Sequence, residues 1–285
     1  MERLLEPLQY AFFIRALIMG ALVGAACGLI GVFVTVRRMS YVGHGLAHAA
    51  FGGAVLAYVS HGNFYLGAGA WVFGAMLLVV FMMRQRRIPA DAAVGLVTTA
   101  SFALGVVLLG RLERVTRNLE SALFGCLLGV TDQDVQVAAV VVLILLGLVV
   151  FNYKGLLATA FDPDAARVVG VPVGKMDLLY AAMLAAVMVL GMRVLGATLL
   201  AAAVVVPAMT ARMLTDRFRT LIFLAPLFGA VFSIGGLYVS FFLNVAAGAA
   251  IVLTGIFGFL IAACCSAWRV GKREKIFGRA LKSGV

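Results

Sequence analysis

The chain has 285 residues, of which 64% are hydrophobic and only 12% are charged, and its mean hydropathy is +1.11. These values exclude an ordinary soluble domain and predict an all-α integral membrane protein with several spans. The formal net charge of +11 does not indicate nucleic-acid binding, because the basic residues lie in short loops and a tail between apolar runs instead of on one basic face.

Nine apolar runs are candidate spans, since about 20 residues cross a ~30 Å hydrocarbon core. They lie near residues 11–35, 41–60, 66–83, 91–110, 134–152, 176–192, 195–211, 221–242 and 249–267. The sixth and seventh runs are separated by only a few residues, so the sequence predicts eight or nine transmembrane helices. The first run is longer than the apolar region of a secretory signal, and we expect it to be retained. The predicted organisation is one polytopic domain over residues 1–268 and a basic cytoplasmic tail over 269–285.

The distribution of Lys and Arg predicts the orientation in the membrane. If nine spans alternate and the C-terminus is cytoplasmic, the basic clusters within 37–38, 84–87, 154–175, 212–219 and 269–282 all fall on the cytoplasmic side. Three arginines between residues 111 and 117 fall on the outer side. In the same outer loop, residues 119–130 are apolar but too few to cross the membrane, which suggests a re-entrant or interfacial helix.

The second run contains two histidines, His44 and His48, directly after a pair of arginines. Residues four apart lie on one face of a helix, roughly 6 Å apart along its axis, so the two imidazoles can share a ligand. Imidazole is a common ligand of zinc, copper, iron and nickel. Polar side chains also hold transmembrane helices together. The residues by themselves leave both a metal pathway and a structural role open.

The segment 156–172, on the predicted cytoplasmic side, differs from the other loops. Asp162 can cap a helix that Pro163 begins, and Gly170 can end it. We therefore expect a short amphipathic helix, which is either an ordered connector or a docking element.

Two further features can line a path through the membrane. Pro207 frees a backbone carbonyl in a span that also carries Thr210, and Asn244 lies in an uncharged outer turn. Both are also compatible with helix packing and an ordinary turn.

The sequence indicates no enzyme. The run from Gly170 to Met176 has the wrong spacing for a phosphate-binding loop and lacks its hydroxyl residue. The four cysteines have no spacing typical of a zinc site, so we interpret them as small apolar residues. ATP hydrolysis by this chain is not expected.

Four segments, 38–49, 161–171, 194–212 and 244–248, together resemble the permease subunits of bacterial ABC importers for zinc, manganese and iron. The resemblance implies the architecture of a type II ABC importer permease, present as a homodimer in the bacterial cytoplasmic (inner) membrane. It implies three protein partners: cytoplasmic ABC ATPase subunits, an extracytoplasmic metal-binding protein and a second copy of the chain. The implied cargo is a divalent transition metal, foremost zinc or manganese and also iron, with no permanently bound cofactor.

The resemblance also implies residue roles. His48 matches a pathway histidine of the family, whereas His44 and Asn244 stand where the family commonly has Asp. Imidazole in place of a carboxylate removes a negative charge and softens the site, which favours zinc over manganese. Segment 156–172 corresponds to the coupling helix that docks on the ATPase, and its implied residues are Phe161, Asp162, Pro163, Asp164, Arg167 and Gly170.

The sequence leaves two other functions open. A stand-alone transporter or channel driven by an ion gradient should carry more ionisable groups in mid-membrane than this sequence offers. A permease for siderophores or cobalamin would share the architecture and differ in accumulating a chelate instead of a free metal.

Overall fold

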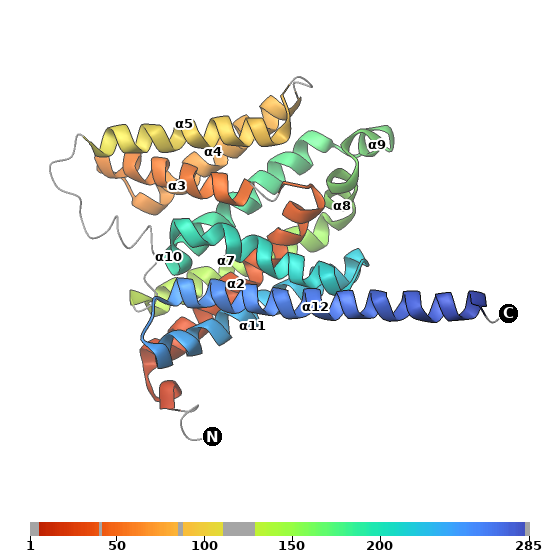
Figure 1. Ribbon diagram of the computed structural model, residues 1–285. Coiled ribbons are helices and arrows are strands. Elements are labelled where there is room, and N and C mark those ends of the chain that lie inside the picture. The colour runs from red at the N-terminus through yellow and green to blue at the C-terminus, as the bar shows by residue number, and fades with distance from the viewer. Residues whose placement is uncertain (1–5, 40–41, 85–87, 111–128, 283–285) are drawn as a thin grey trace.

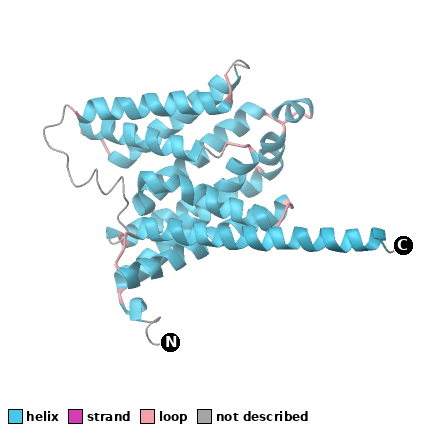
Figure 2. Cartoon of the chain, viewed as in Figure 1, coloured by secondary structure: helices cyan, strands magenta, loops and turns pink. Residues whose placement is uncertain are grey.

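The computed structural model describes residues 6–39, 42–84, 88–110 and 129–282, and within these ranges the chain forms helices and connecting loops without a strand (Figure 2). In chain order the elements are η1 (Glu6–Gln9), α2 (Ala11–Val36), α3 (Val42–Val59), α4 (Phe64–Arg84), α5 (Ala90–Leu109), α7 (Asp132–Phe151), α8 (Tyr153–Phe161), α9 (Pro163–Val168), α10 (Val173–Leu214), α11 (Phe218–Leu243) and α12 (Ala247–Lys282). The expected all-α class is confirmed. Apart from residues 129 and 130, the predicted re-entrant segment 119–130 lies outside the described residues.

Seven helices in the described part of the chain are long and apolar enough to cross a membrane: α2, α4, α5, α7, the first half of α10, α11 and α12. Two shorter apolar helices, Gly45–Val59 and Leu199–Leu214, correspond to the second and seventh predicted runs. The sixth and seventh runs are joined in α10, which is interrupted at Gly196 with φ 76° and ψ 161°. Glycine adopts this backbone conformation without a steric penalty. Element α10 therefore consists of two apolar helical segments that meet at a kink at Gly196.

Helix α2 is the centre of the larger helix group. Its span is 72% buried inside the molecule, more than any other candidate span. Glycines let α11 and α10 approach its backbone. A Cβ atom on Gly24 would lie 2.3 Å from the carbonyl oxygen of Gly229 in α11, and one on Gly31 would lie 2.0 Å from that of Val204 in α10. Small residues of this kind allow close packing of transmembrane helices.

Helices α3, α4 and α5 form a second group, which lies on the far side of the molecule from α11 and α12 (Figure 1). Helix α10 packs against both groups. It contacts α3 and α4 as well as α2, α11 and α12. Helix α12 continues without a break to Lys282 and projects beyond the other helices at the C-terminus (Figure 1). The expected basic tail over 269–285 thus begins as an extension of the last helix, and no proline interrupts it.

Candidate functional site

The two predicted pathway histidines both lie in α3. His44 and His48 are one turn apart in this helix. The imidazole of His48 is half-buried, and its ring centroid lies 5.0 Å from that of Phe102 on α5, in an edge-to-face arrangement at 71°. His48 is therefore positioned at the contact between α3 and α5.

Glycines and small side chains bring α3 and α5 together around His48. A Cβ atom on Gly45 would lie 2.6 Å from the methyl group of Thr98, and one on Gly52 would lie 2.2 Å from the carbonyl oxygen of Ser101. The hydroxyls of Thr98 and Ser101 donate to carbonyls of their own helix, at 2.7 and 2.8 Å. The close approach of the two helices leaves His48 beside the aromatic ring of Phe102.

A closed metal centre is not present within the described residues, since no three His, Cys, Asp or Glu side chains gather there. A site that passes a metal on requires incomplete or weak coordination, because four protein ligands would retain the ion.

The other proposed pathway residues have described contacts elsewhere. Pro207 is buried and lines a small cavity of about 20 Å³ that is formed by α2, α10, α11 and α12. Thr210 is 1% exposed and donates its hydroxyl to the carbonyl of Val206 at 2.8 Å. Asn244 is exposed and ends α11 in the left-handed conformation, with φ 53°. None of these contacts joins the three residues to His48.

The predicted cytoplasmic helix is present as α9, and both of its ends are capped. The carboxylate of Asp162 accepts the backbone N–H groups of Asp164 and Ala165, at 2.9 and 3.0 Å. At the other end, Gly170 has φ +82° and donates its N–H to Arg167, while Val171 donates to Ala166. This pair of bonds is a Schellman motif, which requires a left-handed residue and favours glycine.

Helix α9 and its flanks expose apolar side chains beside charged ones. Phe161 is 65% exposed, Val168 is 88% exposed and Val169 is 75% exposed. Asp164 and Arg167 form an ion pair on the same short helix. Large apolar side chains that gather at a solvated loop mark an interaction surface. The arrangement is suited to insertion into a groove on another protein.

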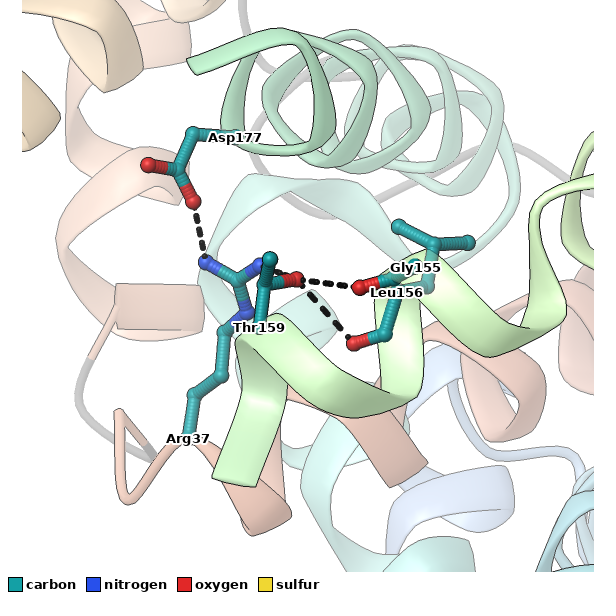
Figure 3. A network of polar contacts seen from close by, with 5 residues as sticks. All are labelled: Arg37, Gly155, Leu156, Thr159 and Asp177. Atoms are coloured by element: carbon teal, nitrogen blue, oxygen red, sulfur yellow. Dashed lines mark hydrogen bonds and ion pairs between the residues drawn. The ribbon is translucent and has the colours of Figure 1, made fainter. Parts of the chain in front are cut away.

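A polar network centred on Arg37 was not identified from the sequence. Its guanidinium donates to the Asp177 carboxylate at 3.0 Å and to the Thr159 hydroxyl at 3.2 Å (Figure 3). The guanidinium carbon also lies 4.3 Å from the centre of the Tyr180 ring. The side chains of Arg37 and Asp177 are only 11% and 13% exposed.

This network joins both flanks of α9 to the connection that leads into α3. Thr159 lies in α8, three residues before the Asp162 cap, and Asp177 lies near the start of α10. Arg37 ends α2, directly before a left-handed residue, Arg38, with φ 55°. Asp177 is the only carboxylate in α10, and an acidic group in an apolar run requires a partner. That signal could have identified the pair.

The sequence profile of the ABC 3 transport family matches residues 9–266. A manganese transport system membrane protein, MntC of Listeria monocytogenes, is 36% identical over 255 residues, which cover 90% of this chain and 91% of that protein. The chelated iron transport system membrane protein YfeC of Yersinia pestis is 33% identical, over 91% of this chain and 88% of that protein.

Among solved structures, PsaBC of Streptococcus pneumoniae in complex with Fab contains a chain with the same fold. The TM-score is 0.81 and the identity is 33%, with 92% of this chain and 94% of that chain covered. A match to the family profile over nearly the whole length, together with two relatives above 30% identity, identifies the family. The chain belongs to the ABC 3 transport family.

Proposed function

We propose that this chain is the membrane permease of an ATP-driven importer that carries manganese or iron into the cell. The observation that carries the proposal is the combination, in one chain, of a histidine-bearing helix and a capped docking helix with exposed apolar side chains. Family membership supports it and disfavours a stand-alone transporter, because members of an ABC family work with a separate ATPase subunit. The chain itself is not the ATPase.

The choice of metal rests on the relatives, which are named for manganese and iron transport. The metal is cargo, and we propose no resident cofactor. Zinc, which His44 favours on ligand chemistry, stays a prediction. A permease for a siderophore or cobalamin remains the second candidate. The two functions are distinguished by whether cells accumulate free metal or a chelate.

We propose that the metal passes between two copies of the chain, each of which contributes His48 as a transient ligand with His44 one turn away. The shortage of clustered ligands in the described part of one copy supports this arrangement. The Asp162-capped segment would dock on the ATPase, and the Arg37 network would transmit its movement toward α3. The remaining partners are an extracytoplasmic metal-binding protein and the lipid bilayer of the bacterial cytoplasmic membrane, with no nucleic acid.

The assignment of His48 is tested by replacing it with alanine and measuring accumulation of manganese, iron and zinc in cells. We expect His48→Ala to abolish accumulation of the transported metal while the amount of protein in the membrane is unchanged. The matched control is His61→Asn, which removes an exposed histidine from a turn whose left-handed backbone, with φ 56°, asparagine tolerates. Normal accumulation by a well-expressed His48→Ala chain would refute the pathway role.

A further inference from the structure

A cleft of about 850 Å³ lies between the end of α7, the start of α8, the loop after α9 and the start of α11. Its walls are mostly apolar, and the main contributors are Leu146, Val150, Phe151, Ile222, Phe223 and Pro226. No residue of α3 or α5 lines it. The cleft is therefore separate from the contact that holds His48.

Two cations stand among these apolar walls. Lys154 is the second residue of α8 and Arg219 the second residue of α11; both line the cleft and both are exposed. No carboxylate belongs to the lining. Over the ranges that the structure describes, no acidic group forms a salt bridge with either side chain. The cleft thus offers two unneutralised positive charges to an occupant.

The surrounding helix surfaces are apolar and exposed. Val150, Phe151 and Phe223 are 70%, 89% and 77% exposed, although they belong to helices apolar enough to cross a membrane. Helix α7 ends at Phe151, so Lys154 lies just beyond the end of the span. The positive-inside distribution places this end on the cytoplasmic side. The cations and the apolar wall therefore meet at the level where lipid headgroups meet acyl chains.

We propose that the cleft binds an anionic phospholipid of the cytoplasmic leaflet. The phosphate lies between Lys154 and Arg219, and an acyl chain follows the apolar wall of α7 and α11. Basic pockets between transmembrane helices on the cytoplasmic side suit anionic headgroups, and the apolar wall accepts the chain. A soluble phosphate would leave that wall uncovered, and an apolar protein segment would leave both cations unpaired.

The occupied cleft also contacts the docking segment. The residues that follow α9, 169–172, form part of the lining. A bound lipid therefore supports the loop that holds the C-terminal end of α9 in place. This consequence for the ATPase rests on the proposed function, whereas lipid binding itself does not.

The test is lipid retention by the purified full-length chain, measured by native mass spectrometry after exposure to vesicles of phosphatidylglycerol or of phosphatidylcholine. We expect preferential retention of phosphatidylglycerol. The variant Lys154→Gln/Arg219→Gln should lower its retention about 25-fold, because each basic residue at an anionic surface contributes a factor of roughly five. Each single variant should lower it about fivefold by the same reasoning.

The control is Lys175→Gln/Arg212→Gln, which removes the same charge from exposed positions outside the lining. We expect it to retain phosphatidylglycerol as the parent chain does. Equal retention of the two lipids, or an equal loss in the control, would overturn the proposal. So would a cation variant that retains lipid but no longer assembles with the ATPase, because the cations would then contact protein. Lipid retention is independent of metal transport, so failure of the His48 test would leave this result unaffected.

Discussion

At the scale of single residues, the Arg37–Asp177 pair is an ion pair that is shielded from solvent. Both side chains are nearly buried, and the tyrosine ring and the Thr159 hydroxyl contact the same guanidinium. In such an environment, removal of one partner leaves a charge without compensation, whereas removal of both partners does not. At the junction of α2, α8 and α10, each member of the pair therefore stabilises the fold mainly because it neutralises the buried charge of the other.

We expect Arg37→Leu and Asp177→Leu each to lower the stability of the folded chain by about 3–5 kcal/mol. The double variant should lose less than either single variant, since no buried charge remains. Thermal unfolding of the purified chain in detergent measures both effects. The Arg15–Asp132 pair, whose side chains are 39% and 72% exposed, provides the control, and Asp132→Asn should change stability little. Additive losses in the Arg37/Asp177 double variant would contradict the argument.

At the scale of elements, α9 is too short to be stable on its own, because isolated helices of fewer than about 12 residues are marginal in water. It has 6 residues, and it depends on the Asp162 cap at one end and the Gly170 turn at the other. The caps determine whether its apolar flanks are presented in a fixed geometry.

Asp162→Ala should remove about 1 kcal/mol of cap stabilisation and reduce association with the ATPase, while membrane abundance stays normal. Hydrogen exchange of the α9 amides and co-purification of the ATPase measure the two effects. Asp164→Ala is the matched control for the hydrogen-exchange measurement, because it removes a neighbouring carboxylate that does not cap the helix. If Asp162→Ala exchanged no faster than the parent chain, the cap would not stabilise α9.

The contact between α2 and α11 is a second feature at this scale. A Cβ atom on Gly28 would lie 2.2 Å from the backbone oxygen of Ala225, closer than any van der Waals contact. We expect Gly28→Ala to separate the two helices and lower the yield of folded protein by several-fold. Gly147→Ala on α7, where nothing lies within 4 Å of the new methyl group, should be tolerated. Detergent-soluble, monodisperse protein is the readout, and equal yields would show that α2 can move without cost.

At the scale of the whole molecule, the helices form two groups that α10 connects (Figure 1). The histidine helix belongs to one group, and the central helix α2 belongs to the other. The Arg37 network lies where the chain passes from α2 toward α3. The Arg37 network therefore links both flanks of α9 to the connection that leads into α3.

The orientation of the molecule is tested by labelling single cysteines in a chain whose four native cysteines are replaced by alanine. Val245→Cys, in the exposed turn before α12, should react with a membrane-impermeant maleimide in intact cells. Lys175→Cys, exposed in the first turn of α10, should react only after lysis. The reverse pattern would place the C-terminus outside.

Much of the fold could be predicted from the sequence, because hydropathy and helix-end signals depend on residues that are close together in the chain. The candidate runs predicted the helices, and Asp162, Pro163 and Gly170 predicted both ends of α9. The continuity of α10 through Gly196 was not predicted, since a left-handed glycine inside a helical trace leaves no distinct sequence signal. The pathway roles assigned to Pro207, Thr210 and Asn244 stay predictions. In the structure, Pro207 and Thr210 pack within the helices, and Asn244 lies in a turn.

The sequence by itself determined the class of molecule, because apolar runs of membrane-spanning length require helices whose backbone groups are satisfied internally. It also determined the capped helix α9 and the spacing of the two histidines in α3, since each depends on residues within one or two turns. Only the tertiary structure decided that His48 lies against Phe102, that Arg37 pairs with Asp177, and that Lys154 and Arg219 line one cleft. Those contacts join residues that are far apart in the chain, so they depend on how the helices pack against one another.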